Sequence, residues 1–276
     1  MNKRGVWTLA KKDMNAVKAS VQLWLPMVLL PVLLGAALPG GVLIWVRFFD
    51  LTSIGNMEVL LRTLEAIEDP ALQALFGSMP SLTHQLVYFL SMYLFAPLFL
   101  LIPVMAASVI TANSFAGEKE RKTLEGLLYT PLTMGELFLG KALAAFIPAL
   151  LLTVASFLLY GVVVNTLAYP LFTRMIFPNG SWLLLVFLVI PALSIFIILL
   201  NILISAKVKG FQEAYQLGGL VVLPIVALVI GQAVGFLFIR PLLLLAIAFA
   251  IVVLSLIFFK LIRRFTKRHE FLEKMG

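Results

Sequence analysis

Residues 182–204 read WLLLVFLVIPALSIFIILLNILI and contain no charged side chain. An α-helix rises about 1.5 Å per residue, so a run of this length can cross the hydrocarbon core of a bilayer, about 30 Å thick. Its apolar residues are continuous, whereas a spanning β-strand would alternate lipid-facing and lumen-facing residues. The stretch therefore predicts a membrane-crossing helix.

Five further runs of the same kind occur along the chain. The six predicted spans cover residues 22–46, 86–112, 142–165, 182–204, 217–239 and 241–259, and none contains Asp, Glu, Lys, Arg or His away from its ends. Of the 276 residues, 62% are hydrophobic and 12% are charged. This composition differs strongly from that of a soluble domain. We predict one all-α polytopic membrane domain over residues 1–276.

The basic residues give the orientation of the predicted spans. With six spans, 17 of the 21 Lys and Arg residues fall on the side that holds both termini, and four fall on the other side. By the positive-inside rule, both termini are expected in the cytoplasm. A net charge of +8 is also compatible with nucleic-acid binding, but these cations lie in short clusters at span ends, so we expect no nucleic-acid partner.

Two segments outside the spans have helical patterns. Residues 3–20 predict an amphipathic helix at the cytoplasmic interface, in contact with lipid; the alternative is a solvated leader that only orients the first span. Its apolar stripe consists of Trp7, Ala10, Met14, Val17 and Val21. Residues 48–83 form the largest predicted external segment, too short for an independent domain, and we interpret them as a lid on the span ends. Pro70 suits the first turn of a short helix through Phe76.

A charged segment, SFAGEKERKTLEGLLYTPLTMGELFLGK at residues 114–141, separates the second span from the third. It holds eight of the 34 formal charges. Leu124, Leu127 and Leu128 share one face of a helix predicted from Arg121 to Thr130. Two charge pairs at (i, i+4) spacing are expected to support it, Glu118 with Lys122 and Arg121 with Glu125.

The end of this predicted helix leads into the next one. Pro131 ends the first helix near Tyr129, because a residue before proline avoids the helical conformation. Thr133 and Glu136 are spaced for a capping box, which predicts a helix that continues through Lys141 into the third span. The pattern predicts an amphipathic surface helix joined to a transmembrane helix. A surface helix that merely covers span ends is the alternative.

No enzyme signature is present in the sequence. The two histidines, His84 and His269, fall on opposite sides of the membrane, and there is no zinc pair or Ser/His/Asp set. Residues 135–142, GELFLGKA, match a phosphate-loop spacing until Ala142, where Ser or Thr would hold magnesium. Without ionisable groups deep in the spans, a proton-driven carrier is disfavoured. We predict no catalytic residue and no metal site.

Residues 117–128, GEKERKTLEGLL, followed by Pro131 and by Gly140-Lys141, resemble the hallmark of type-2 ABC exporter permeases. This is the G-like, type V class, which includes bacterial sodium- and drug-extrusion systems. The resemblance implies a bacterial plasma-membrane permease with a connecting helix at residues 3–20 and a coupling helix within 114–141. The near absence of a loop between spans five and six, at residues 239–241, departs from the eukaryotic members.

The resemblance also implies the partners and the contact residues. The coupling helix would dock on a separate ABC ATPase subunit, which would bind ATP and magnesium, so this chain is expected to hold no cofactor. The implied coupling residues are Glu118, Glu120, Arg121, Thr123, Leu124, Glu125, Leu127, Leu128, Pro131, Gly140 and Lys141. A second cytoplasmic contact is expected at residues 205–216, with Lys207, Lys209 and Glu213. The permease is expected as a homodimer, or as a heterodimer with a related permease.

Other functions remain open from the sequence. A scaffold or biogenesis subunit would bind a cytoplasmic partner and transport nothing, and a channel or carrier would work without ATP. The lack of charge within the spans favours a hydrophobic or amphiphilic cargo, while the resemblance to sodium extruders keeps an ion open. Export is the direction that the family implies.

Overall fold

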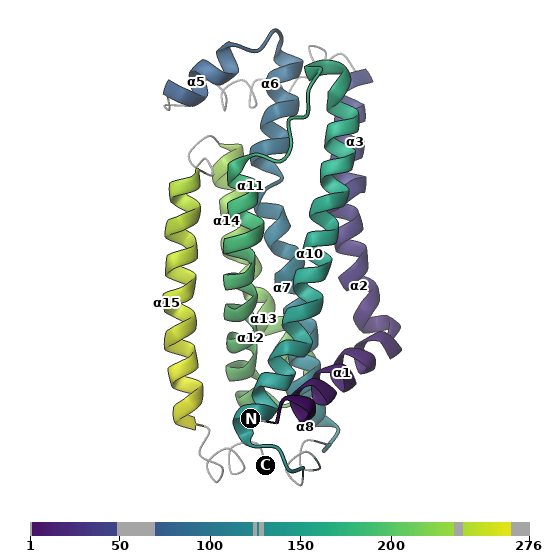
Figure 1. Cartoon of the computed structure of the whole chain (residues 1–276), viewed down its shortest axis with the longest axis vertical. Coiled ribbons are helices and arrows are strands. Elements are labelled where there is room, and N and C mark those ends of the chain that lie inside the picture. Colours follow the sequence, from purple (N-terminus) through teal and green to yellow (C-terminus); the bar gives the residue numbers. More distant parts are fainter. Residues whose placement is uncertain (1, 49–69, 124–125, 127–129, 235–239, 266–276) are drawn as a thin grey trace.

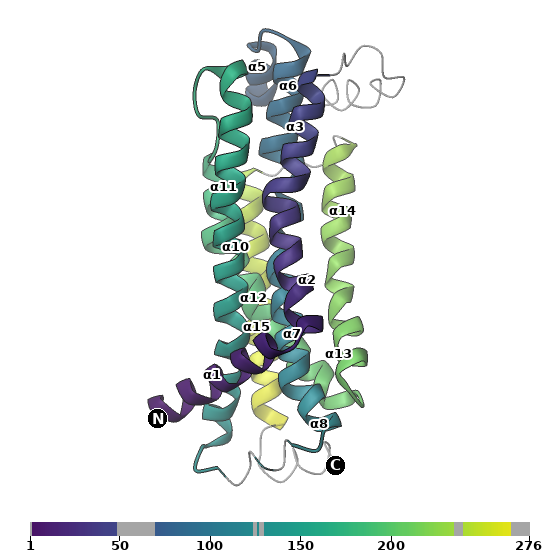
Figure 2. The same ribbon diagram turned by 90° about the vertical axis from the view of Figure 1, so that its right-hand side faces the viewer.

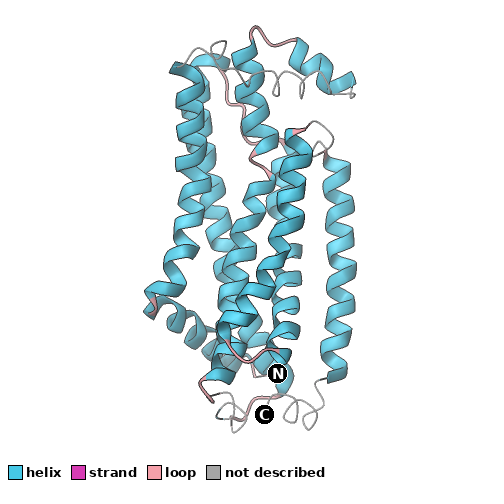
Figure 3. Cartoon of the chain, turned by 180° about the vertical axis from the view of Figure 1, so that it is seen from behind, coloured by secondary structure: helices cyan, strands magenta, loops and turns pink. Residues whose placement is uncertain are grey.

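A computed structural model describes residues 2–48, 70–123, 126, 130–234 and 240–265 of the chain. The described residues form helices and connecting turns without a strand (Figure 3). Within these ranges, six helices are long and apolar enough to cross a membrane: Val21–Val46, Leu82–Glu120, Met134–Phe172, Gly180–Lys207, Phe211–Ala233 and Pro241–Arg263. The prediction of an all-α polytopic membrane protein with six spans is confirmed.

Several spans contain π- or 3₁₀-helical turns between α-helices. The first span consists of α2 (Val21–Val32), a π turn at Leu33–Ala37 and α3 (Leu38–Phe48). The second consists of α6 (Leu82–Phe89), turns at Leu90–Leu94 and Pro97–Leu100, α7 (Leu101–Ala112), a π turn at Asn113–Gly117 and α8 (Glu118–Glu120). The third is one helix, α10 (Met134–Phe172).

The fourth and fifth spans also contain such turns, whereas the sixth is a single helix. The fourth contains α11 (Gly180–Leu184), a π turn at Leu185–Val189 and α12 (Ile190–Lys207). The fifth contains α13 (Phe211–Gly218), a 3₁₀ turn at Gly219–Val221 and α14 (Val222–Ala233). The sixth is α15 (Pro241–Phe265). Figure 1 shows α11, α14 and α15 ending below the tops of α3, α6 and α10.

The helices of the second and third spans extend beyond the predicted spans. Each contains 39 residues, and the predicted spans within them are 86–112 and 142–165. A helix of 39 residues is about 58 Å long, which exceeds a hydrocarbon core of about 30 Å. The start of α10 after Thr133 agrees with the predicted capping box, and at its other end the helix continues past Asn165 and Tyr169 to Phe172.

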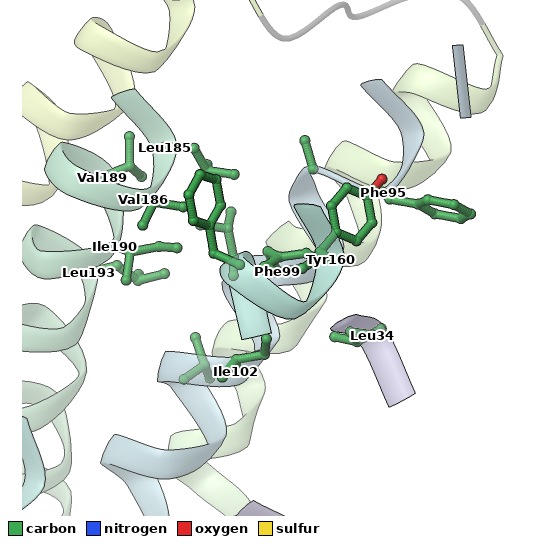
Figure 4. Packing of buried hydrophobic residues seen from close by; sticks show 14 of the residues in the cluster. Leu34, Phe95, Phe99, Ile102, Tyr160, Leu185, Val186, Val189, Ile190 and Leu193 are labelled. Atoms are coloured by element: carbon green, nitrogen blue, oxygen red, sulfur yellow. The ribbon is translucent and has the colours of Figure 1, made fainter. Parts of the chain in front are cut away.

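Aromatic side chains join α10 to the second and fourth spans. Tyr160 and Trp182 are fully buried and stack with ring centroids 4.8 Å apart. Phe99 meets both rings edge-on, at 5.1 and 4.8 Å (Figure 4 shows Tyr160 and Phe99 together). The Tyr160 hydroxyl donates to the carbonyl of Ser91, at 2.7 Å. These contacts hold three spans as one core.

The connection from α10 to α11 runs back along the bundle. Asn165 holds it, because its Oδ1 accepts from the backbone N–H groups of Ile176 and Phe177, each at 3.1 Å. Its Nδ2 donates to the Phe177 carbonyl at 2.8 Å. The Phe177 ring then packs against Tyr160 and Trp182. The fourth span can therefore begin closer to the middle of the bundle than the third span ends.

A short helix, α5 (Pro70–Gly77), precedes the second span at one end of the bundle. Its start at Pro70 agrees with the prediction. Phe76 is buried and its ring lies 6.0 Å from that of Tyr88. The rest of the proposed lid, residues 49–69, lies outside the described residues, so the lid remains a prediction.

Candidate functional site

Helix α1 (Lys3–Ala19) lies obliquely across the end of the bundle where α8 ends and α10 begins (Figure 2). We call this end the α8 end. The predicted apolar stripe is divided: Ala10 and Val17 are buried, whereas Trp7 and Val21 are exposed. The residues of α1 that are buried are Val6, Leu9, Ala10, Asp13 and Val17. The packed face is therefore rotated toward α10 and includes one acidic side chain.

The starts of α1 and α10 are bonded to each other. The predicted capping box is confirmed, since the Glu136 N–H donates to Thr133 Oγ1 at 3.3 Å and the Thr133 N–H donates to Glu136 Oε2 at 2.9 Å. The other carboxylate oxygen of Glu136 accepts from the backbone N–H of Asn2. Asn2 Oδ1 in turn caps α1 by accepting from the Gly5 N–H at 3.0 Å.

Gly140 allows α1 to approach α10 closely. A Cβ at this position would lie 3.0 Å from both the Leu9 Cδ2 atom and the Val6 carbonyl oxygen. These distances are shorter than ordinary van der Waals contacts. The glycine of the predicted Gly-Lys pair therefore serves as the contact surface for the N-terminal helix.

Lys141, the next residue, is the centre of a buried charge cluster formed by Lys12, Asp13, Glu118 and Lys141. Its side chain is 0% exposed, and Nζ lies 2.6 Å from Glu118 Oε2 and 3.3 Å from Asp13 Oδ2. It also donates to the Ser114 carbonyl at 2.6 Å. An ammonium has three N–H donors, so each donor of Lys141 has an acceptor.

Lys12 completes the charge cluster from its rim. Its Nζ lies 2.6 Å from Glu118 Oε1 and 3.6 Å from Asp13 Oδ1, so two carboxylates face two ammonium groups. Burial lowers the pKa of Lys12, but the hydrogen bond and charge of Glu118 and the charge of Asp13 outweigh it and raise the pKa above its usual 10.5. The cluster is neutral overall and links α1, α8 and α10.

A helix was predicted from Arg121 to Thr130, and the structure contradicts the predicted start. The helix of the second span ends at Glu120, and Lys122 adopts a left-handed φ of 57°. The Lys122 N–H donates to the Lys119 carbonyl and the Thr123 N–H to the Glu118 carbonyl, each at 3.0 Å, which is a Schellman motif. Lys122 therefore cannot form the predicted helical pair with Glu118, whose carboxylate faces Lys12 and Lys141 instead.

Glu120 joins the two segments that the sequence predicted as separate contacts. Its Oε2 accepts from the Phe211 N–H at 2.9 Å, at the start of α13. Gly210 permits this approach, because a Cβ there would lie 2.6 Å from the same oxygen. Within the second segment, Glu213 Oε2 accepts from the Lys209 N–H at 3.0 Å. No local pattern in the sequence indicates this bond, which joins residues 91 positions apart.

The remaining predicted site residues divide by exposure. Arg121 is exposed and its guanidinium donates to Asn113 Oδ1 at 3.3 Å. Other exposed residues of the prediction are Thr123, Pro131, Lys207, Lys209 and Glu213. Leu124, Glu125, Leu127 and Leu128 lie outside the described residues. ATPase contact by any of these side chains remains a prediction.

Sequence reasoning missed Asp13 and the burial of Glu118. Asp13 is the only acidic residue among residues 1–20 and is spaced helically with Ala10 and Val17, a pattern that could have identified it as an inward-facing partner. The arrangement can act mechanically, because a displacement of the segment after Glu120 would act directly on α1 and α10. Among the described residues, no group of three or more His, Cys, Asp or Glu side chains could hold a metal ion.

The family comparison matches most of the chain. A family model described as ABC-2 family transporter protein matches residues 7–248, which include most of α1, the charge cluster, the first five spans and the start of the sixth. Comparisons with curated proteins and with solved structures gave no match.

Proposed function

The chain belongs to the ABC-2 transporter family, and from this we propose that it is the permease subunit of an ATP-driven exporter. A separate ABC ATPase subunit binds and hydrolyses ATP with magnesium. This chain supplies the path through the plasma membrane and holds no cofactor itself. Two permease chains, identical or related, pair with two ATPase subunits.

The orientation rests on the distribution of basic residues. The α8 end carries Lys12, Lys119, Lys122 and Lys141, among others, which is the excess expected for the cytoplasmic side. The segment from Arg121 to Thr133 then faces the cytoplasm, where a soluble ATPase can reach it. Arg121, Lys122 and Thr123 at its start are exposed.

The observation that carries the proposal is the charge cluster at the end of the second span, where this segment begins. The second span ends at Glu120, two residues after Glu118 contacts Lys141. A buried ion pair whose polar atoms are all matched resists separation, because a lone buried charge is costly. Movement of the ATPase against the Arg121–Thr133 segment is therefore passed to α8, α10 and α1 together.

The second predicted contact moves with the first. Glu120 holds the N–H of Phe211 at the start of α13, so the segment at residues 205–216 is attached to the end of the second span. The ATPase then acts on one connected surface formed by the two segments. The fifth span begins with α13 and receives the same displacement.

The cargo is hydrophobic or amphiphilic in this proposal. Apart from the charge cluster at the α8 end, the buried polar groups of the described spans are hydroxyls and amides such as Ser108, Ser194, Asn201 and Gln232. Several of them bond within the bundle, as Ser194 does to the Ile190 carbonyl at 2.8 Å. These groups provide no fixed charge for selecting a bare ion.

Charge reversal on the exposed segment tests the proposal. Lys122→Glu changes an exposed residue that is not part of the charge cluster, and Glu125→Lys changes a residue that the family resemblance implies as a coupling contact. Glu120 is unsuitable because it also holds α13. We expect each variant to insert normally and to lose co-purification with the ATPase encoded beside this chain's gene. Lys11→Glu, on the exposed face of α1, is the matched control.

Transport assays separate the rival functions. Vesicles containing the permease and ATPase should show ATP hydrolysis that depends on the permease and falls in Lys122→Glu. A scaffold would bind the ATPase without changing its turnover. A channel or carrier would give flux from vesicles that contain this chain alone, and either result would refute the proposal.

A further inference from the structure

A long apolar groove lies on the outside of the bundle, between α10 and α15. Two adjoining cavities of about 550 and 490 Å³ share Leu139, Ala142, Leu199 and Phe259 as lining residues. Figure 1 shows α12 between α10 and α15. We call the combined feature the α10–α15 groove; α12 forms its floor.

The groove follows the parts of α10 and α15 that lie nearest the α8 end. Along α10 its lining extends from Met134 to Phe146, and along α15 from Arg263 to Val252. At about 1.5 Å per residue these distances are about 18 and 16 Å. The predicted spans begin at residue 142 on α10 and end at residue 259 on α15. The mouth of the groove therefore lies outside these spans, and its inner end lies within them.

The chemistry of the groove changes along its length. The deep part is lined by aliphatic and aromatic side chains together with Ser255. The Ser255 hydroxyl donates a hydrogen bond to the Ile251 carbonyl at 2.8 Å. The surface end carries Arg263, which is exposed. Within the described part of the chain, its guanidinium forms no ion pair or hydrogen bond. The Arg263 guanidinium is thus a cation at the open end of the apolar α10–α15 groove.

We propose that the α10–α15 groove binds a membrane phospholipid, with one acyl chain between the helices and the phosphate paired with Arg263. Guanidinium and phosphate match each other in geometry as well as charge. Each cavity lies in the range of small-molecule sites, about 300 to 1,000 Å³. This site is independent of the proposed export function.

A helix from a second copy of this chain fits the groove less well. A helix would bring no anion to Arg263 unless an acidic residue followed it, whereas every phospholipid carries a phosphate at the membrane surface.

Photo-crosslinking tests the proposal with the full chain in vesicles. The probe is phosphatidylglycerol with a diazirine at the end of one acyl chain, present as a trace in phosphatidylcholine. We expect crosslinks to concentrate at the deep end of the groove, on Phe146, Ile195 and Leu256. Arg263→Ala should weaken this labelling about tenfold, the loss expected for one charge-assisted hydrogen-bonding group.

The matched control is Lys260→Ala, which removes an equal charge from the same helix at a position that does not line the groove. It should leave the labelling unchanged. Ala142→Trp, where the two cavities meet, should abolish the labelling in correctly inserted protein. Labelling spread evenly onto α14, at Leu223 and Ile230, with no effect of Arg263→Ala, would overturn the proposal.

A cysteine test addresses the second copy directly. The chain contains no cysteine, so Leu256→Cys provides a single thiol in the groove. We expect the Leu256→Cys protein to form no disulfide-linked dimer when it is oxidised in the membrane. Efficient disulfide-linked dimers would show that another chain occupies the groove and would overturn the lipid assignment.

Discussion

Lys141 and Glu118, 23 positions apart, form an ion pair of 2.6 Å in which the lysine side chain is 0% and the glutamate side chain 7% exposed. This pair connects the last turn of the second span to the first turns of the third. The same ammonium contacts Asp13 of α1, so three chain segments depend on one buried cation. The charge cluster is the structural basis for the predictions about the α8 end.

Lys141→Met should be strongly destabilising. It leaves Asp13 and Glu118 buried with only Lys12 as a counter-charge, and breaking a buried pair typically costs about 3–5 kcal/mol. We expect a lower thermal unfolding midpoint in detergent and a lower yield. Lys11→Met, at an exposed position, is the control. Adding Glu118→Gln to Lys141→Met should recover part of the loss, and a midpoint equal to wild type for the single variant would contradict the assignment.

Gly140→Ala should loosen α1 from α10. The new methyl group would be 3.0 Å from Leu9 Cδ2 and from the Val6 carbonyl oxygen, and such overpacking costs about 1–3 kcal/mol. Faster proteolytic cleavage within α1 is the readout. Gly135→Ala, in the first turn of α10, is the matched control, because a Cβ at this position would have no neighbouring atom within 4 Å. It should be neutral or stabilising. If α1 were cleaved at the same rate in both variants, the close contact at Gly140 would be refuted.

Lys122→Gly should stabilise the end of the second span. Lys122 has a φ of 57°, a conformation that glycine adopts without a Cβ penalty. We expect a gain of about 1 kcal/mol, the cost of left-handed backbone for an L-residue. Lys119→Gly, three residues earlier inside the helix, should lose about the same amount. The thermal unfolding midpoints of the two variants should therefore shift in opposite directions from that of the wild type. Shifts in the same direction would argue against the Schellman motif.

The contribution of the Lys12 contact to stability should fall in the alkaline range. Because the pKa of Lys12 is raised above 10.5 in the folded chain, its contribution is fully present below 10.5 and is lost as the pH rises through the higher folded value. Lys12→Gln should therefore be less stable than wild type at neutral pH, and the difference should shrink above pH 10.5. A difference that instead disappears between neutral pH and 10.5 would contradict this.

Much of the fold could be predicted because it depends on local composition. Long apolar runs specify spanning helices in any context, and the capping box at Thr133 and Glu136 is specified by spacing alone. The length of α10 was underestimated, because Asn165 reads as an interfacial residue and instead holds Ile176 and Phe177 outside the helix.

The site was harder to predict because its bonds are long-range. Glu118 and Lys122 have the spacing of a helical pair, yet the buried ammonium of Lys141 offers Glu118 a stronger partner. Nothing local indicates that Glu120 meets Phe211, since the contact depends on how α7 and α12 pack. Family resemblance located the segment, and only the packing revealed which of its charges point inward.

In the proposed function, the segment after Glu120 transmits the work of a separate ATPase. ATP turnover tests this, measured for the ABC ATPase that we expect to be encoded beside this chain and reconstituted in vesicles with wild-type, Lys122→Glu or Lys11→Glu permease. We expect turnover that depends on the permease, is retained in Lys11→Glu and falls to the level of the ATPase alone in Lys122→Glu. Turnover that is the same with and without the permease would contradict it.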